Sequence, residues 1–170
     1  MTVEIRALHA DDDRKTFRSD DQALDLYFHR YAGQNQFRHH IGVTYVAVEA
    51  ERILGFATVS PATLDAEDLP SGRKMPPYPI PVLRVARLAV DASARKRGIG
   101  RAIVRFCIEL AERLREEVGC VGLLVDAKPE AEPFYGQLGF VSLSLVEGAA
   151  HAIPAPVPMY LPLGAVPRRG

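Results

Sequence analysis

The chain has 170 residues, of which 48% are hydrophobic and 25% charged, the composition of a globular protein with one well-buried core. Its formal net charge is zero, which by itself argues against strong nucleic-acid binding, and no stretch is apolar and long enough to cross a membrane. The N-terminus has no signal-peptide pattern and the two cysteines, Cys107 and Cys120, lie in apolar runs as buried thiols do, so we expect a cytoplasmic protein without a membrane partner.

The first third of the chain predicts a strand, a helix and a hairpin. Residues 2–8 alternate weakly, as in an edge strand. Ser19 and Gln22 have the spacing of a helix-capping box, and a helical apolar face follows over residues 24–31. Residues 42–60 contain two runs of β-branched and aromatic residues on either side of a short polar turn, which predicts an antiparallel hairpin.

The rest of the chain predicts alternating strands and helices. Six prolines between residues 61 and 81 exclude a regular element there. Residues 82–90 become continuously apolar, which predicts a strand buried on both faces at its far end, and residues 99–114 carry a helical apolar stripe. A strand, a short helix and two strands follow over residues 120–127, 130–139, 140–147 and 156–163. This order of elements predicts a mixed α/β sheet with helices on its faces.

A basic, glycine-containing turn precedes the long predicted helix. Arg95, Lys96 and Arg97 stand before Gly98, and Gly100 follows one residue later. A helix N-terminus presents unpaired N–H groups and a partial positive charge, so this turn is suited to a phosphorylated ligand. A Gly-x-Gly pattern also occurs at ordinary helix starts with a solvated basic face, and neither a Gly-x-Gly-x-x-Gly nor a Walker motif is present. The turn alone therefore leaves both interpretations open.

Two motifs in this order resemble the GNAT family of N-acetyltransferases. The first is Arg95-Lys96-Arg97-Gly98-Ile99-Gly100, between the fourth strand and the following helix, and the second is Phe134-Tyr135 followed by Gly139-Phe140. The resemblance covers residues from about 20 to about 163. It implies a single α/β domain over residues 1–163, with a tail over 164–170. It also implies a mixed, mostly antiparallel sheet flanked by helices, with splayed fourth and fifth strands.

The resemblance also implies acetyl-CoA as cofactor and a set of residues that bind it. The pantetheine arm would pair with the fourth strand, and the pyrophosphate would lie on the amides around Gly98. A backbone N–H near Val90 would polarise the thioester carbonyl, and the acceptor amine would attack directly. The implied cofactor-binding residues are Leu88, Ala89, Val90, Arg95, Lys96, Arg97, Gly98, Ile99, Gly100, Arg101 and Phe134.

Tyr135 is the candidate general acid. The leaving thiol has a pKa of about 8.5 by analogy with cysteine, and a phenol with a pKa near 10 is able to protonate the thiolate. The resemblance places Tyr135 in this role beside Val90 as a catalytic residue. The alternative is a core tyrosine whose hydroxyl bonds to a neighbouring group.

Segments outside the cofactor motif resemble the acetyltransferase toxins of toxin–antitoxin systems. They lie in the first helical region at Leu24, Asp25, Tyr27, Gln34 and Gln36, and before the glycine turn at Pro79-Ile80-Pro81 and Arg87-Leu88-Ala89-Val90. This resemblance implies an aminoacyl-tRNA as the acceptor, a ribbon-helix-helix antitoxin as a partner, and a homodimer. An α-amino group has a pKa of about 7.7 to 8, so acetylating it needs no dedicated strong base.

Basic residues could hold the phosphates of the tRNA. Between residues 84 and 105 there are seven lysines and arginines and one acid, Asp91. The candidate acceptor-binding residues are Arg38, Arg73, Lys74, Arg84 and Arg87. Three alternatives stay open: an acetyltransferase of small-molecule or protein amines with no toxin role, a non-catalytic acyl-CoA-binding module that would not need Tyr135, and a partner-binding scaffold.

Overall fold

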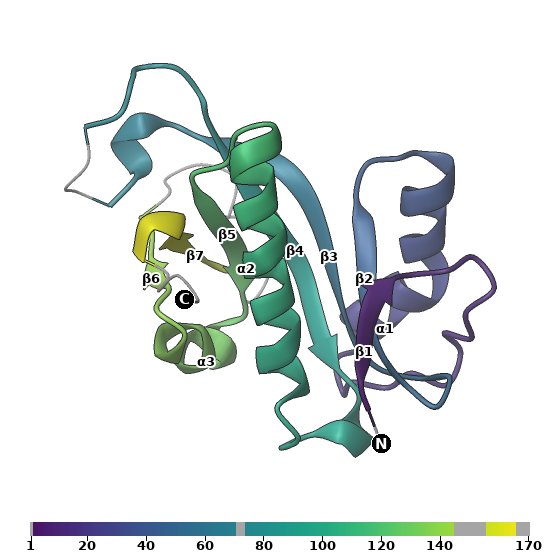
Figure 1. The fold of residues 1–170 in the computed structure, drawn as a ribbon. Helices are drawn as coiled ribbons and strands as arrows, with labels where there is room; N and C mark the ends of the chain where they lie inside the picture. The colour runs from purple at the N-terminus through teal and green to yellow at the C-terminus, as the bar shows by residue number, and fades with distance from the viewer. Residues whose placement is uncertain (1, 71–73, 145–155, 166–170) are drawn as a thin grey trace. The chain divides into compact units, whose positions relative to one another are not determined.

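The computed structural model describes residues 2–70, 74–144 and 156–165 (Figure 1). In these residues seven strands form one mixed sheet in the order β1-β2-β3-β4-β5-β7-β6, with β4 and β5 parallel and the other neighbours antiparallel. The strands are β1 Glu4–Ala7, β2 Val43–Glu49, β3 Arg52–Leu64, β4 Ile80–Val90, β5 Gly122–Ala127, β6 Val141–Ser142 and β7 Val157–Pro162. The helices are α1 Gln22–Leu26, α2 Ile99–Glu117 and α3 Glu132–Gln137. This sequence of elements, with helices flanking the sheet, confirms the predicted fold class.

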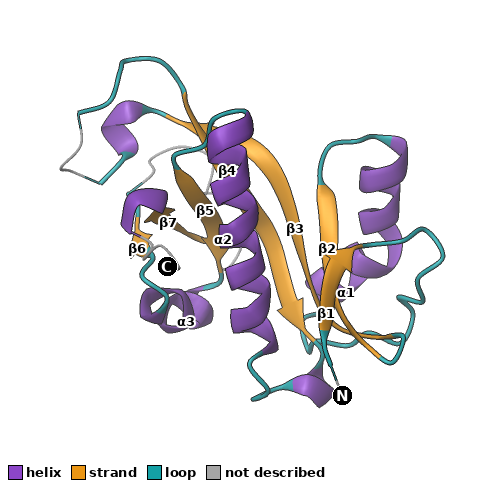
Figure 2. Ribbon diagram, in the orientation of Figure 1, coloured by secondary structure: helices purple, strands orange, loops and turns teal. Residues whose placement is uncertain are grey.

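The chain divides into two compact units. The first unit consists of residues 1–60 and 85–109, and the second unit of residues 61–84 and 110–170. The long strands β3 and β4 and the helix α2, drawn in Figure 2, each contribute residues to both units by their residue ranges. The splay of β4 and β5 that the family resemblance implies stays a prediction.

Helices cover both faces of the β2–β3 hairpin in the first unit. Phe28, which follows α1, stacks on Phe56 of β3 with the ring centroids 4.3 Å apart, and Phe17 meets Phe56 edge-on at 5.4 Å. Gly55 directly precedes Phe56 in β3, so the two residues face opposite sides of the sheet. A Cβ atom on Gly55 would lie 2.9 Å from Cδ1 of Ile103 in α2. The missing side chain thus allows α2 to approach the strand closely.

The hairpin turn itself is unusual in composition. Ala50 and Glu51 connect the paired residues Glu49 and Arg52, and both have positive φ angles, 49° and 68°. Two consecutive positive φ angles are typical of the type I′ turn, whose twist matches that of the flanking strands. The sequence predicted the hairpin correctly although neither turn residue is a glycine or an asparagine.

The second unit has its own apolar core. Leu64 of β3, Val82 of β4, Leu124 of β5 and Tyr160 of β7 are all buried and pack together. Leu124 and Tyr160 are direct neighbours in the β5–β7 register. The Tyr160 hydroxyl donates a hydrogen bond to the Val121 carbonyl at 3.3 Å, so its polar end is satisfied at the edge of the core.

The start of α1 differs from the prediction. Asp21, not Ser19, caps the helix, because its carboxylate accepts the Leu24 N–H at 3.0 Å. Ser19 instead donates its hydroxyl to the buried carboxylate of Asp25 at 2.6 Å. Beyond α1 the chain stays helical, and residues Tyr27–Tyr31 and Gln34–Arg38 form π-helical turns.

Two predictions for the strands were also wrong in detail. β3 runs through Pro61 to Leu64, because the fixed φ of proline is compatible with extended backbone wherever no ladder N–H is required. β4 is buried on both faces near its start, at Val82 and Leu83, whereas burial alternates at its far end. The strand predicted over 140–147 is seen only as β6, and its residues 145–147 lie outside the described range.

Both cysteines are buried free thiols, as the sequence predicted. Cys107 in α2 has no exposed surface, and burial raises its pKa to about 12. Cys120 precedes β5, and burial raises its pKa as well. No described helix has the length and apolar character needed to cross a membrane. Within the same residues, no group of three His, Cys, Asp or Glu side chains is arranged to hold a metal ion.

Candidate active site

The glycine turn joins β4 to α2 in the first unit. After Val90 the chain passes through Asp91 and a single 3-10 turn, Ala92–Ala94, and reaches Gly98 before α2 begins. The Gly98 carbonyl accepts the Ala102 N–H at 3.0 Å, so the amides of the residues between them have no partner within the helix. A Cβ atom on Gly98 would meet nothing within 4 Å. The open space and the unpaired amides together suit an anionic group at this helix end.

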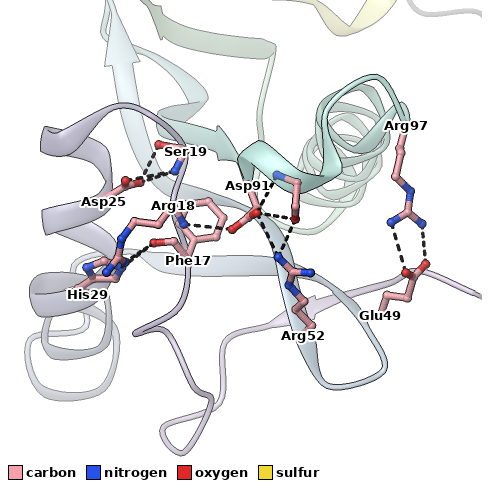
Figure 3. Close-up of polar contacts among 10 residues, drawn as sticks. Phe17, Arg18, Ser19, Asp25, His29, Glu49, Arg52, Asp91 and Arg97 are labelled. Atoms are coloured by element: carbon pink, nitrogen blue, oxygen red, sulfur yellow. Dashed lines mark hydrogen bonds and ion pairs between the residues drawn. The ribbon is translucent and has the colours of Figure 1, made fainter.

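Two arginines of the turn, Arg95 and Arg97, are paired with acids from distant parts of the first unit, and Figure 3 shows the pair of Arg97 with Glu49. Arg97 donates to both carboxylate oxygens of Glu49, at 2.6 and 3.3 Å. This hydrogen bond and the charge of the arginine lower the pKa of Glu49 below its ordinary value. Arg95 bonds to the carboxylate of Asp20 and to the Ser19 carbonyl.

Two other cations of the turn are less constrained. Lys96 and Arg101 are exposed, and neither makes an ion pair with any of the described residues. Lys96 has a positive φ of 64°, which turns the chain just before Gly98. Arg101 stands in the first turn of α2 and lines a shallow groove together with Gly98. Among Arg95, Lys96, Arg97 and Arg101, these two are therefore the cations whose charge no acid of the described residues pairs with.

Asp91 is the most connected side chain next to the turn (Figure 3). Its carboxylate accepts hydrogen bonds from the Arg18 N–H at 3.0 Å and from the N–H and hydroxyl of Ser93 at 3.0 and 2.6 Å, with Arg52 at 3.4 Å. Burial alone would raise the pKa of this carboxyl, but the Ser93 and Arg18 hydrogen bonds and the Arg52 charge outweigh burial and hold the pKa below its ordinary value. In the sequence, Asp91 is the one acid among the cations of residues 84–105.

The predicted cofactor-binding strand residues differ in exposure. Leu88 and Val90 are half-buried, whereas Ala89 between them is 6% exposed. Side chains alternate along a strand, so Leu88 and Val90 share one face of β4 and Ala89 takes the other. The far end of β4 therefore keeps one face partly open.

The second motif forms a helix end in the second unit. Tyr135 in α3 is 5% exposed and packs edge-on against Phe134 and Phe140, with ring centroids 5.0 and 5.5 Å apart. Gly139 has a φ of 98°, and the Phe140 N–H returns to the Tyr135 carbonyl at 3.1 Å. The glycine reverses the chain after α3, and this reversal brings Phe140 against the tyrosine ring.

The predicted acceptor-binding residues are divided between the two units. In the first unit, Arg38 is exposed and the Arg87 guanidinium lies 3.9 Å from the ring centroid of Tyr27. In the second unit, Lys74 is exposed and Arg84 is paired with Asp126, its Nε donating at 2.8 Å. Arg73 lies outside the described residues. The sequence missed the acids that neutralise Arg84, Arg95 and Arg97 because each is at least forty residues away along the chain.

Comparison with known proteins agrees with the motifs. The family model described as an acetyltransferase (GNAT) domain matches residues 40–142, a range that includes the hairpin, the glycine turn and Tyr135. A tRNA-acetylating toxin of Mycobacterium tuberculosis (strain ATCC 25618 / H37Rv) is 30% identical over 131 residues, which are 76% of this chain and 78% of the toxin.

Two solved structures are similar over nearly the whole chain. AtaT complexed with acetyl-methionyl-tRNAfMet has a TM-score of 0.84 and 26% identity, with 96% of both chains covered. AtaTR bound with AcCoA has a TM-score of 0.77 and 27% identity, with 96% of this chain and 95% of that chain covered.

Proposed function

The chain belongs to the acetyltransferase (GNAT) family, and we propose that its acceptor is the α-amino group of an aminoacyl-tRNA. As a family member it is an acetyl-CoA-dependent N-acetyltransferase. The observation that carries the choice of acceptor is the 30% identity to a tRNA-acetylating toxin over 76% of the chain. The 26% identity to AtaT, whose structure holds acetyl-methionyl-tRNAfMet, supports the same choice.

The glycine turn is the proposed site of the acetyl-CoA phosphates. The unpaired amides at the start of α2 and the open space beside Gly98 fit a pyrophosphate, and Arg101 and Lys96 add positive charge. Leu88 and Val90 offer the half-open face of β4 to the pantetheine arm, and the Val90 backbone amide polarises the thioester carbonyl. Acetyl-CoA supplies the acetyl group as a thioester.

Tyr135 is the proposed general acid. Its hydroxyl protonates the departing thiolate, because a phenol with a pKa near 10 remains protonated at neutral pH while it is able to donate to a thiolate. Packing between Phe134 and Phe140 fixes the orientation of the ring. The amino group of an aminoacyl-tRNA has a pKa of about 7.7 to 8, so a useful fraction is neutral and nucleophilic without a strong base.

The toxin relatives support a proposal about the partners. We propose that residues 1–163 act as one cytoplasmic acetyltransferase domain that forms a homodimer and is neutralised by a ribbon-helix-helix antitoxin. The exposed residues Arg38, Lys74 and Arg87, with Arg73, hold tRNA phosphates. Arg84 contributes less, because Asp126 already balances its charge.

The direct test is transfer of a labelled acetyl group. The purified protein is incubated with labelled acetyl-CoA and a total aminoacyl-tRNA pool, and deacylated tRNA serves as the control. Label is expected on the amino group of the esterified amino acid, and none on deacylated tRNA. Label on polyamines or protein amines but never on charged tRNA would support the general amine acetyltransferase instead, and acetyl-CoA binding without any transfer would support the non-catalytic module.

A further inference from the structure

We propose that Asp91 is a positioning residue for acetyl-CoA: its carboxylate ties the glycine turn to the backbone of Arg18 and so sets the direction of the first amides of α2. This proposal rests on the proposed binding of the coenzyme at residues 95–101. Asp91 is 4% exposed, so it acts through the backbone that it holds and not by touching the ligand.

The hydrogen bonds of Asp91 leave the start of the turn little freedom. Its backbone N–H donates to the Leu54 carbonyl at 2.8 Å, and its carbonyl accepts the Ala94 N–H at 2.9 Å. Its carboxylate meanwhile accepts the N–H of Arg18, whose own carbonyl accepts the Ala92 N–H at 2.8 Å. The end of β4 is thereby fixed to both the hairpin and the N-terminal segment.

A second contact attaches the same N-terminal segment further along the turn. Arg95 donates to the Ser19 carbonyl at 3.0 Å and to the carboxylate of Asp20. Ser19 is in turn bonded to Asp25 in α1 through both its N–H and its hydroxyl. The turn is therefore attached to residues 18–20 at two points, Asp91 and Arg95, and that segment is fixed to α1.

The chemistry of the site requires a carboxylate. Every group that meets Asp91 is a donor: two backbone N–H groups, the Ser93 hydroxyl and the Arg52 guanidinium. A carboxylate has two acceptor oxygens and no donor, so it satisfies them all. An asparagine would direct an NH₂ group at one of these donors and would lack the charge that strengthens the remaining bonds.

The test compares two isosteric variants, Asp91→Asn and Asp12→Asn. Asp12 is a matched control, because its carboxylate also accepts a backbone N–H, from His9 at 2.7 Å, and an arginine, Arg6 at 2.9 Å. We expect Asp91→Asn to weaken acetyl-CoA binding about tenfold, as measured by calorimetry, and to raise the KM for acetyl-CoA by the same factor while kcat changes less than about twofold. Asp12→Asn is expected to leave both acetyl-CoA constants unchanged.

Ser93→Ala keeps the proposal testable if Asp91→Asn does not fold. Ser93 is exposed, and the change removes one donor to Asp91 and one contact with Arg52, so a shift of about threefold in acetyl-CoA affinity is expected. Unchanged acetyl-CoA affinity in folded Asp91→Asn or in Ser93→Ala, or an equal shift in Asp12→Asn, would overturn the positioning role. Gly98→Glu tests the underlying assumption separately: normal acetyl-CoA binding in that variant would refute the coenzyme site itself and with it the role of Asp91.

Discussion

The two motif-bearing segments, residues 91–98 and residues 134–140, are both chain reversals at a helix end, but different forces hold them. Each contains a glycine with positive φ, Gly98 at 76° and Gly139 at 98°. The first segment is held by carboxylates, since Asp91, Asp20 and Glu49 accept hydrogen bonds from its backbone and side chains. The second is held by ring packing around Tyr135 and by a backbone helix cap.

This difference fits the roles that we propose for the two segments in acetyl transfer. A turn that binds phosphates needs exposed amides, so it has little apolar surface to bury and its conformation depends on polar contacts made behind it. A general acid needs a fixed, poorly solvated hydroxyl, and aromatic packing provides this without adding charge. The two segments should consequently respond to different perturbations: the first to charge and pH, the second to side-chain shape.

The largest effect is expected from Gly98→Glu. A carboxylate would enter the space proposed for the pyrophosphate, where like charges repel and the helix-end amides become blocked. Acetyl-CoA binding measured by calorimetry should fall at least about a thousandfold. Gly98→Ala is the matched control: its methyl group meets no protein atom within 4 Å and adds no charge, so binding should fall far less than in the glutamate variant. Normal binding in the glutamate variant would remove the turn from the site.

A smaller effect, on turnover alone, is expected from Tyr135→Phe. The change removes a proton donor and almost no volume, so kcat should fall about a hundredfold while acetyl-CoA affinity stays within about twofold. The measurement is the rate of acetyl transfer to a verified acceptor between pH 6 and pH 9. An unchanged rate across that range would show that the hydroxyl is not the acid.

The shape dependence of the second segment is tested by Gly139→Ala. Its φ of 98° lies outside the left-handed helical region, and the added Cβ would lie 3.3 Å from Cδ1 of Leu161. We expect the free energy of unfolding to fall by about 2 kcal/mol, against about 1 kcal/mol for Gly98→Ala, which has strain without a close contact. Urea denaturation of both variants measures the difference, and equal losses would contradict this account.

The smallest effect is expected from mild acid. The pKa of Asp91 is lower in the folded protein than its ordinary value of 3.8, so its contribution to stability is complete above that value and is lost as the pH falls through the folded pKa. Hydrogen-exchange protection, corrected for intrinsic rates, should therefore fall below about pH 4 at residues 91–98 and remain constant at residues 134–140. An equal loss of protection in both segments would contradict the view that carboxylates hold residues 91–98 while ring packing holds residues 134–140.

Local patterns in the sequence predicted the elements and both motifs because these depend on nearest neighbours along the chain. Hydrophobic periodicity predicted the helix that contains Ile103, and β-branched runs predicted the hairpin. The helix cap was assigned to Ser19 because its spacing to Gln22 fitted a capping box, although Asp21 is two residues nearer to the helix. Serine and aspartate have similar N-cap propensities, so propensity alone did not distinguish Ser19 from Asp21.

The electrostatics of the site could not be predicted in the same way. Counting cations around the turn overestimated the charge available to a ligand, since Glu49 and Asp20 are brought to Arg97 and Arg95 only by the fold. Asp91 did carry a local signal: an aspartate at the end of a strand, two residues before a serine, is typical of a side chain that bonds to its own backbone. Its bond to Arg18, 73 residues earlier, has no such signal.

The burial of both thiols has a practical consequence for measuring this enzyme. Acetyl transfer releases the free thiol of coenzyme A, which reacts with chromogenic disulfide reagents through its thiolate. Cys107 has no exposed surface and a pKa of about 12, and Cys120 is 5% exposed with a raised pKa, so neither supplies thiolate to the reagent while the protein is folded. Continuous photometric recording of coenzyme A release should thus have no background from the native protein, and a slow rise in absorbance in a sample without acetyl-CoA would report unfolding.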